Sequence, residues 1–284
     1  MTGGGGTIGE AAARAFAAAG AKVAVLDRDR EAALRAAEKV TGLAVGCDVT
    51  RADSVATAFA DVVRAYGGMD ILVSNAGAAW QGKIGEVDEA VLRESFELNF
   101  FAHQRVAQAA VRIMEAQRTG GCRLFNVSKQ AVNPGPDFGP YGLPKAATLF
   151  LSRQYAVDYG DAGIRSNAVN ADRIRSGLLT DEMVKIRSAA RKLSEREYMT
   201  GNLLGQKVTA DDVANAFVAL ALAGPRPRSS RSTASSSRSS CGSRRAAIRT
   251  GPDKYVIADI RCAKPYVHVR IAVLRAAAQR CAWP

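Results

Sequence analysis

The sequence predicts an α/β fold whose parallel sheet is doubly wound, with helices packed on both of its faces. Three observations lead to this prediction. Short apolar runs alternate with segments of helical spacing from residue 9 to about residue 223, a glycine-rich turn opens the chain, and polar residues follow directly after several apolar runs. Alternating strands and helices are typical of a parallel sheet, because consecutive parallel strands need a crossover connection. Ligands of such folds bind at the carboxyl ends of the strands.

Five apolar runs have the length and the β-branched content of strands. They cover residues 21–27, 42–49, 69–77, 122–128 and 164–170. An Ala-rich helix follows the opening glycines, and Gly20 and Gly67 have the position of helix-ending glycines. The remaining predicted helices cover residues 29–40, 52–67, 88–118, 141–160 and 210–224.

The composition is that of an ordinary globular protein. The chain has 284 residues, 48% of them hydrophobic and 23% charged, which suffices for one large domain with a full core. No apolar run approaches the roughly 20 residues that a membrane span needs. The five cysteines lack the tight spacing of a zinc site or a disulfide framework. We therefore expect reduced thiols, no membrane partner and a cytoplasmic protein.

The net charge of +12 by itself suggests a nucleic-acid partner, but the positions of the charged residues do not support this for the main domain. Residues 224–284 carry 13 Lys or Arg and 2 Asp or Glu, which leaves residues 1–223 with a net charge of +1. The basic charge belongs to the tail and does not indicate what the main domain binds. We divide the chain into a domain at 1–223 and a Ser- and Arg-rich tail at 224–284, which is predicted to be disordered.

The segment "TGGGGTIG" at 2–9 precedes a helix, where exposed N–H groups and the helix dipole favour a phosphate group. A flexible glycine loop is the alternative. Asp27 ends the next strand, 18 residues after Gly9. A carboxylate there can accept hydrogen bonds from an adenosine ribose and repels a 2′-phosphate, which favours NAD over NADP, although Arg28 follows directly.

Two further strand ends carry small or acidic residues. In "SNAG" at 74–77 the small side chains allow a cofactor to approach the backbone, or they form a simple turn. In "CDV" at 47–49, Asp48 can meet an adenine amino group or cap the following helix.

The strongest catalytic signal is Tyr141 followed by Lys145, with Ser128 at the end of a strand 13 residues before the tyrosine. The i, i+4 spacing places the tyrosine and the lysine on one face of a helix. His103 lies four residues after Asn99 on the long helix, and we interpret it as packed or exposed rather than catalytic. Two histidines in the whole chain argue against a histidine-based triad or metal site.

Taken in order, these motifs resemble the short-chain dehydrogenases/reductases over about residues 1–223. Within that family, residues 125–147 and 166–183 look most like the dehydrogenase half of bifunctional aldolase/dehydrogenase proteins of the rhamnose-degradation type. The resemblance implies a Rossmann-type fold and an NAD-dependent oxidoreductase of carbohydrate metabolism. The implied reaction transfers a hydride between nicotinamide and a small alcohol or carbonyl substrate, such as a polyol, a hydroxy-aldehyde or a sugar derivative.

The resemblance also implies catalytic roles. Tyr141 would be the general acid/base, and Ser128 would hydrogen-bond the reacting oxygen. Lys145 and the positive ring of the cofactor would together lower the phenol pKa, and Lys145 would also hold the nicotinamide ribose. Asn99 would hold a water that links Lys145 to solvent.

The cofactor contacts implied by the resemblance form a larger set. They are Gly3, Thr7, Ile8, Gly9, Asp27, Asp48, Val49, Asn75, Ala76, Gly77, Tyr141, Lys145 and Ser176. Three departures from the family pattern accompany them. Thr7 replaces a glycine beside the pyrophosphate, Ala171 and Asp172 replace a Pro-Gly pair, and Pro144 requires the helix to begin near Tyr141.

Both ends of the chain depart from the family. A strand is expected before the glycine turn, yet only Met1 and Thr2 precede it. Our hypothesis is that Met1 is the valine usual at this place, read from a GTG codon, and that the start has been placed too late. Residues 229–234 match an out-of-frame reading of the expected last strand, which favours a frameshift near 223–225.

Alternative interpretations follow from these ends. The chain as written is an inactive product of a dehydrogenase gene, or a protein that binds RNA or acidic surfaces through its basic tail. The Arg- and Lys-rich region at about 172–205 is expected to select the substrate, and it suits an anionic or polyhydroxy compound or is a solvated helix. The family implies a homodimer or homotetramer that pairs through helices 88–118 and 141–160.

Overall fold

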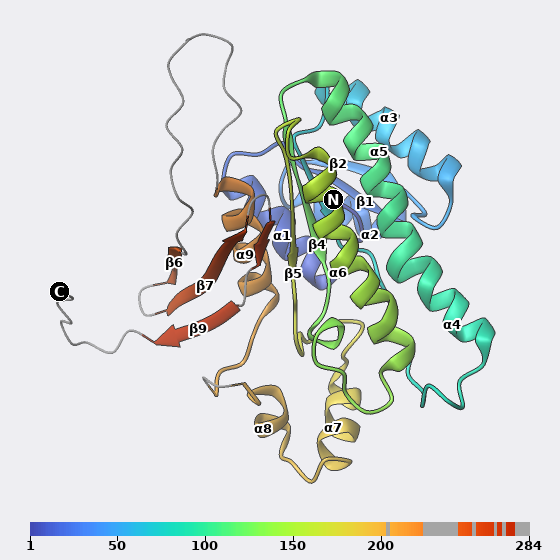
Figure 1. Ribbon diagram of the computed structural model, residues 1–284, viewed down its shortest axis with the longest axis vertical. Helices are drawn as coiled ribbons and strands as arrows, with labels where there is room; N and C mark the ends of the chain where they lie inside the picture. The colour runs from blue at the N-terminus through green and yellow to red at the C-terminus, as the bar shows by residue number, and fades with distance from the viewer. Residues whose placement is uncertain (203–204, 224–243, 252–253, 264–265, 269–270, 276–284) are drawn as a thin grey trace, which may run out of the picture.

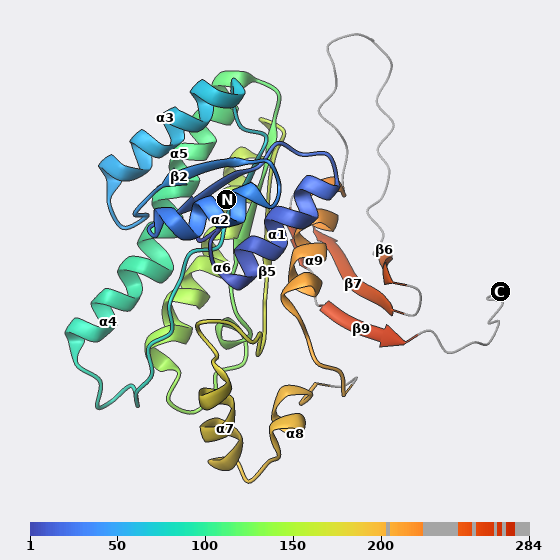
Figure 2. The same ribbon diagram turned by 180° about the vertical axis from the view of Figure 1, so that it is seen from behind.

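In the computed structural model, helices cover both faces of a parallel sheet, as seen from opposite sides in Figure 1 and Figure 2. The structure describes residues 1–202 and 205–223, together with strands at 244–251, 254–263, 266–268 and 271–275. The predicted α/β fold with parallel pairing is confirmed.

Each strand of the domain overlaps one of the predicted apolar runs. The strands are β1 Ala24–Asp27, β2 Leu43–Gly46, β3 Ile71–Ser74, β4 Gly121–Asn126 and β5 Ile164–Val169. The helices are α1 Thr7–Ala18, α2 Arg30–Glu38, α3 Ala52–Tyr66, α4 Glu89–Phe96, α5 Ala102–Gln117, α6 Gly139–Tyr159, α7 Asp181–Ala189, α8 Glu195–Met199 and α9 Ala210–Leu222.

The parallel strands form two half-sheets, one with the order β1-β2 and one with the order β3-β4-β5. Of the residues that the structure describes, only Met1 and Thr2 pair between β1 and β3. The Thr2 N–H donates to the Val73 carbonyl at 3.0 Å, and the Leu26 N–H donates to the Met1 carbonyl at 2.8 Å. A cavity of about 590 Å³ continues from these two residues between the facing edges of β1 and β3, and we call it the slot.

The hydrophobic core has one part on each face of the sheet. On one face α1, α2 and α9 bury a cluster that includes Phe16 and Phe217. On the other face α3, α5 and α6 bury a second cluster around Phe59, Met114 and Phe125. Both clusters reach across the two half-sheets, so helix packing joins parts of the sheet that share few hydrogen bonds.

The long helical stretch predicted over 88–118 is confirmed, but it is not a uniform α-helix. A π-helical turn, η1 Glu97–Phe101, separates α4 from α5 and contains the buried Asn99. A π turn inserts one extra residue into the helix and is frequent at functional sites. It changes which side chains face the sheet beyond it, and these include His103.

Helix α6 begins at Gly139, two residues before Tyr141 and so near the predicted start. Pro144 nevertheless lies inside the helix rather than in its first turn, and its ring nitrogen cannot donate to the carbonyl of Pro140. Before this helix, the short 3₁₀ turn η2 Lys129–Ala131 follows β4 directly. Ser128 therefore sits between the strand and the turn.

The structure describes part of the tail that the sequence predicts to be disordered. Residues 244–275 contain four strands in antiparallel pairing, β6 Arg244–Gly251, β7 Lys254–Ala263, β8 Tyr266–His268 and β9 Ile271–Arg275. The predicted frameshift point and the Ser- and Arg-rich run at 224–243 lie outside the described residues. In the part of the chain that is described, no helix is long and apolar enough to cross a membrane.

Candidate active site

Two adjoining cavities lie over the carboxyl ends of the strands. The larger, of about 670 Å³, extends from the glycine turn past the ends of β1, β2 and β3. The smaller, of about 340 Å³, contains Ser128 and Tyr141 and reaches α7 and α8. Both are lined by Ile8, Asn126 and Ser176, so these residues mark the border between them.

The structure brings most of the predicted cofactor residues to the larger cavity. Its lining includes Gly3, Thr7, Ile8, Asp27, Asp48, Val49, Asn75, Ala76, Gly77 and Ser176. Gly9 is buried below the turn, and Tyr141 belongs to the smaller cavity. Lys145 is buried and lies beside Gly77, with its Nζ atom 3.3 Å from the place that a Cβ of that glycine would take.

The glycine turn is shaped by close backbone contacts. Gly3 has a φ of +60° and accepts a hydrogen bond from Asn75 Nδ2 at 2.9 Å. A Cβ on Gly9 would overlap the Gly3 carbonyl oxygen and lie 2.6 Å from the Gly4 Cα. Helix α1 begins at Thr7 without a side-chain cap, so its first N–H groups and its positive dipole end are directed to the cavity.

The two predicted acidic residues are held in fixed orientations. The carboxylate of Asp27 accepts hydrogen bonds from the Gly5 N–H at 3.0 Å and from the Asp29 N–H at 3.1 Å. Asp48 accepts from the side chain and the backbone N–H of Thr50, at 2.7 and 2.9 Å. The hydroxyl contact is the main cause that lowers the pKa of Asp48, which therefore stays ionised. Asp48 does not cap α3, whose N-cap residue is Arg51.

Tyr141 and Ser128 both line the smaller cavity, and the Ser128 hydroxyl is near enough to the phenol to influence its pKa. Burial raises the pKa of Tyr141, and the hydrogen bond from Ser128 lowers it by a smaller amount. The sequence-based expectation that Lys145 and the positive ring of a bound cofactor together lower the phenol pKa stays a prediction. The Lys145 Nζ atom lies 5.8 Å from the centre of the tyrosine ring, and burial lowers the pKa of its own ammonium to about 7.

Asn99 reaches the same place from the π turn. Its amide nitrogen donates to the Ala78 carbonyl at 2.8 Å, and its backbone carbonyl accepts from the Thr148 hydroxyl at 2.6 Å. The Oδ1 atom is buried and has no hydrogen-bond partner in the described part of the chain. It lies 2.9 Å from the place that a Cβ of Gly77 would take, on the side where Lys145 also approaches. A buried amide oxygen without a partner fits a site completed by a ligand or a water.

Sequence reasoning missed two residues of this site. Asn126 ends β4, accepts from Lys145 Nζ through its carbonyl at 3.0 Å and donates from its amide to Asn75 Oδ1 at 2.7 Å. Of the two alternatives for His103, packed or exposed, the structure shows the buried one, and its Nε2 atom lies 3.3 Å from Lys145 Nζ. The position of Asn126 at the end of a predicted strand could have identified it as a site residue. The inward orientation of His103 could not be identified in this way, because it depends on the π turn.

The residues present fit a nicotinamide dinucleotide. The turn leaves no space for a Cβ at Gly9, which is the kind of close backbone packing that a pyrophosphate site needs. The helix N-terminus suits the phosphates, and Asp27 suits the adenosine ribose. The buried Oδ1 atoms of Asn99 and Asn126 remain available on the side of Lys145.

Comparisons with known proteins agree with this geometry. A family model described as enoyl-(acyl carrier protein) reductase matches residues 5–227. L-Rhamnose 1-dehydrogenase (NAD(P)(+)) of Azotobacter vinelandii is 32% identical over 231 residues, which is 78% of this chain and 88% of that protein. The uncharacterised oxidoreductase YuxG of Bacillus subtilis is 37% identical over 187 residues, but this match spans only 27% of its length.

A solved structure gives the same result at the level of the fold. The 3-ketoacyl-(acyl-carrier-protein) reductase of Brucella melitensis, complexed with NADH, superposes with a TM-score of 0.69 at 25% identity. The superposition covers 78% of this chain and 88% of that one.

Proposed function

Because this chain belongs to the short-chain dehydrogenase/reductase family, we propose that it transfers a hydride between NAD and a small alcohol or carbonyl compound. The observation that carries this proposal is that Ser128 and Tyr141 line one cavity beside the cofactor-sized cavity, while the buried Lys145 lies on the same helix as Tyr141. The narrower substrate class of polyols, hydroxy-aldehydes and sugar derivatives rests on the sequence resemblance alone. We further propose that the protein acts in the cytoplasm.

In this proposal the residues of the chain handle the proton. NAD supplies the acceptor for the hydride when it is bound. In the oxidation direction Tyr141 takes the hydroxyl proton of the substrate, and the Ser128 hydroxyl orients the same oxygen. Burial raises the pKa of Tyr141, so its phenolate needs a nearby cation. Lys145 is the buried cation on the same helix, and the Asn126 carbonyl holds its Nζ atom at 3.0 Å.

Asp27 supports NAD as the preferred cofactor. Its carboxylate is already fixed by two backbone N–H groups at the cavity wall, so it cannot turn away from a 2′-phosphate without losing both hydrogen bonds. Arg28 lines the same cavity and favours NADP. We assign the preference to Asp27 because a fixed carboxylate can accept hydrogen bonds from the ribose hydroxyls.

An apolar stripe on α6 supports self-association. Leu143, Phe150 and Val157 follow one another at seven-residue intervals and are 47%, 63% and 62% exposed. Exposed apolar residues in one line on a helix are typical of an interface. We propose that two copies of the chain pair through this face, which lies on one of the two helices that the sequence assigned to oligomer contacts.

The replacement Tyr141→Phe tests the proposed function. Turnover of a panel of polyols and hydroxy-aldehydes with NAD should fall by roughly 10²–10⁴-fold, because the phenol group that handles the proton is lost. Affinity for NADH, measured by fluorescence titration, should remain close to that of the wild type. A variant with the full wild-type rate would show that Tyr141 is not the acid/base.

A further inference from the structure

The smaller cavity carries an excess of positive charge beside the catalytic pair. Four of the residues that line it are basic, and Asp172 is the single acidic one; the basic residues are Lys129, Arg173, Arg187 and Arg191. The domain at 1–223 has a net charge of only +1. The positive charge at this cavity is therefore a local feature and not a consequence of the overall composition.

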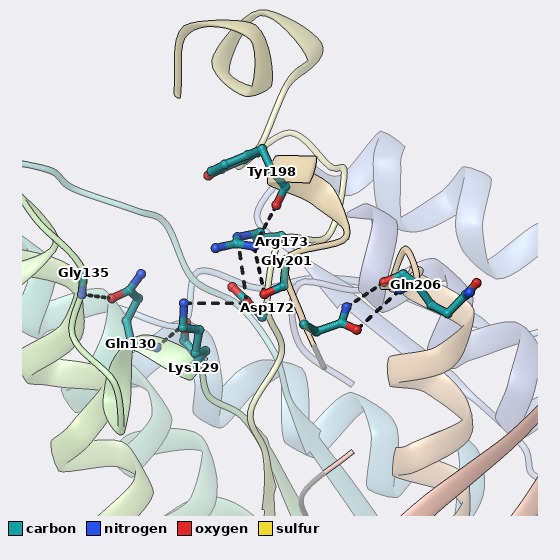
Figure 3. A network of polar contacts seen from close by, with 10 residues as sticks. Lys129, Gln130, Gly135, Asp172, Arg173, Tyr198, Gly201 and Gln206 are labelled. Carbon is teal, nitrogen blue, oxygen red and sulfur yellow. Dashed lines mark hydrogen bonds and ion pairs between the residues drawn. The ribbon is translucent and has the colours of Figure 1, made fainter. Parts of the chain in front are cut away.

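Asp172 engages two of these four cations. Its Oδ2 atom lies 3.8 Å from Lys129 Nζ and 3.9 Å from Arg173 Nε. Figure 3 draws both contacts as dashed lines. Arg173 also donates to the carbonyl of Tyr198 at 2.7 Å and to that of Gly201 at 3.4 Å. This network connects the end of β5 to α8, so Lys129 and Arg173 already have structural partners.

Arg187 and Arg191 have no carboxylate partner among the described residues. The Arg187 guanidinium lies 5.2 Å from the ring centre of Phe138, and the Arg191 guanidinium lies 5.5 Å from that of Tyr198. Aromatic faces orient a guanidinium without neutralising it. The Phe138 ring is in turn 6.4 Å from the ring of Tyr141. The Phe138 ring is thus close to both the Arg187 guanidinium and the acid/base.

We infer that the substrate carries a carboxylate or phosphate group, which Arg187 and Arg191 bind while Ser128 and Tyr141 bind its reacting oxygen. This inference rests on the proposed function. Guanidinium groups bind both kinds of anion through paired hydrogen bonds, which a hydroxyl of a neutral polyol does not match in strength. The cavity volume of about 340 Å³ is at the small end of ligand sites and suits a compound of a few carbons.

The test compares alcohols that differ only in charge. Glycerol, glycerate and glycerol 3-phosphate, and the matching aldehydes in the reverse direction, are assayed with the wild type and with Arg187→Gln, Arg191→Gln and the double variant. Lys185→Gln is the matched control, because Lys185 is an exposed cation of the same helix that does not line the cavity. The carboxylate and phosphate members of each set distinguish the two anions.

The expected result is a KM at least tenfold lower for one anionic member than for its neutral partner. The double arginine variant should remove this difference and leave the KM of the neutral compound unchanged, and Lys185→Gln should keep it. Equal KM values for charged and neutral compounds, or the same effect of the arginine variants on both, would overturn the inference.

A binding measurement separates this inference from the proposed function. Inorganic phosphate and malonate are titrated by calorimetry into the protein saturated with NADH. Binding that weakens at least tenfold in Arg187→Gln or Arg191→Gln, but not in Lys185→Gln, supports an anion site even if no compound of the panel is turned over. Equal binding to all of these proteins would contradict the site even if Tyr141-dependent turnover of neutral alcohols is found.

Discussion

The Lys145 Nζ atom lies 3.3 Å from Nε2 of His103, whose Nδ1 atom is 2.7 Å from the Ser74 hydroxyl. Burial, and then the charge of Lys145, lower the pKa of His103 well below its ordinary value, so the ring is neutral. An ammonium can only donate, so Nε2 is the acceptor while Lys145 is charged, and Nδ1 carries the proton toward Ser74. His103 thereby favours the charged form of Lys145.

Replacement of His103 should therefore change the pH dependence of catalysis. Asparagine reaches Ser74 but not Lys145, whereas glutamine can place an amide oxygen near the position of Nε2. In His103→Asn, the ammonium of Lys145 loses a hydrogen-bond acceptor, so the charged form of Lys145 is less favoured. The phenolate of Tyr141 then has less support from a cation, and we expect the apparent pKa that limits alcohol oxidation to rise by about one unit. His103→Gln should stay closer to the wild type.

Nitrogen NMR of the wild type provides an independent check. The ring nitrogens of His103 should show the Nδ1–H tautomer and no titration across the pH range of the assay. If both variants have the wild-type pH profile, His103 is a packing residue without influence on Lys145.

Lys145 should cost the folded protein stability at neutral and acidic pH. Burial lowers its pKa from 10.5 to about 7, so between these pH values the unfolded chain binds a proton that the folded chain lacks. Stability should rise with pH across this window, and the cost is fully present below pH 7. Lys145→Met should therefore be more stable at pH 6, by on the order of 3 kcal/mol, while losing activity.

Urea unfolding at pH 6 and pH 9 measures this effect. The gain from Lys145→Met should be larger at pH 6 than at pH 9. Lys185→Met, at an exposed position, is the control and should show no such difference. An equal gain at both pH values would mean that the lysine is not desolvated in the folded protein.

Gly9→Ala should disrupt the glycine turn. The added methyl group would overlap the Gly3 carbonyl, so the turn must open at the place where the pyrophosphate would bind. We expect at least a tenfold loss of NADH affinity and a lower Tm. Gly85→Ala is the control, because a Cβ at Gly85 meets nothing within 4 Å. Unchanged NADH titrations for Gly9→Ala would place the dinucleotide elsewhere.

Asp27→Ser should shift the cofactor preference toward NADP. Loss of the carboxylate removes the repulsion of a 2′-phosphate and leaves Arg28 at the same cavity wall. The ratio of kcat/KM for NAD to that for NADP should fall at least tenfold. Glu31→Gln, an exposed acid on α2, should leave the ratio unchanged. If the two variants behave alike, Asp27 does not select the cofactor.

The order of elements and the residues at strand ends were predictable because they depend on local patterns. Apolar runs located the strands, and the i, i+4 spacing placed Tyr141 and Lys145 on one helix. The contact of Asn75 with Asn126 was not predictable, since it arises from the register that pairs Ser74 with Phe125. The inward position of His103 depends on a π turn that has no sequence signature.

The pKa of Tyr141 could not be predicted for a different reason. Sequence spacing shows that a cation is near, but it does not show how far the phenol is removed from water. In the structure desolvation is the larger cause, and it also lowers the pKa of Lys145. Desolvation raises the phenol pKa and a nearby cation lowers it. Which of the two effects is larger depends on the burial of the residues in three dimensions, and the spacing of two residues in the sequence does not give that burial.

Because of the slot, a bound dinucleotide would help to hold the two half-sheets together. The adenosine end of the dinucleotide would lie against β1 and β2, and its nicotinamide end would lie against β3 and β4. Between these half-sheets the backbone is connected through hydrogen bonds of Met1 and Thr2. The ligand would then bridge the two half-sheets across the slot. Without it, amide protons of β1 and β2 should exchange with solvent faster than those of β4, whose neighbours pair it on both sides. With the dinucleotide bound, the exchange rates of β1 and β2 should approach that of β4, because separation of the half-sheets would first require the dinucleotide to dissociate.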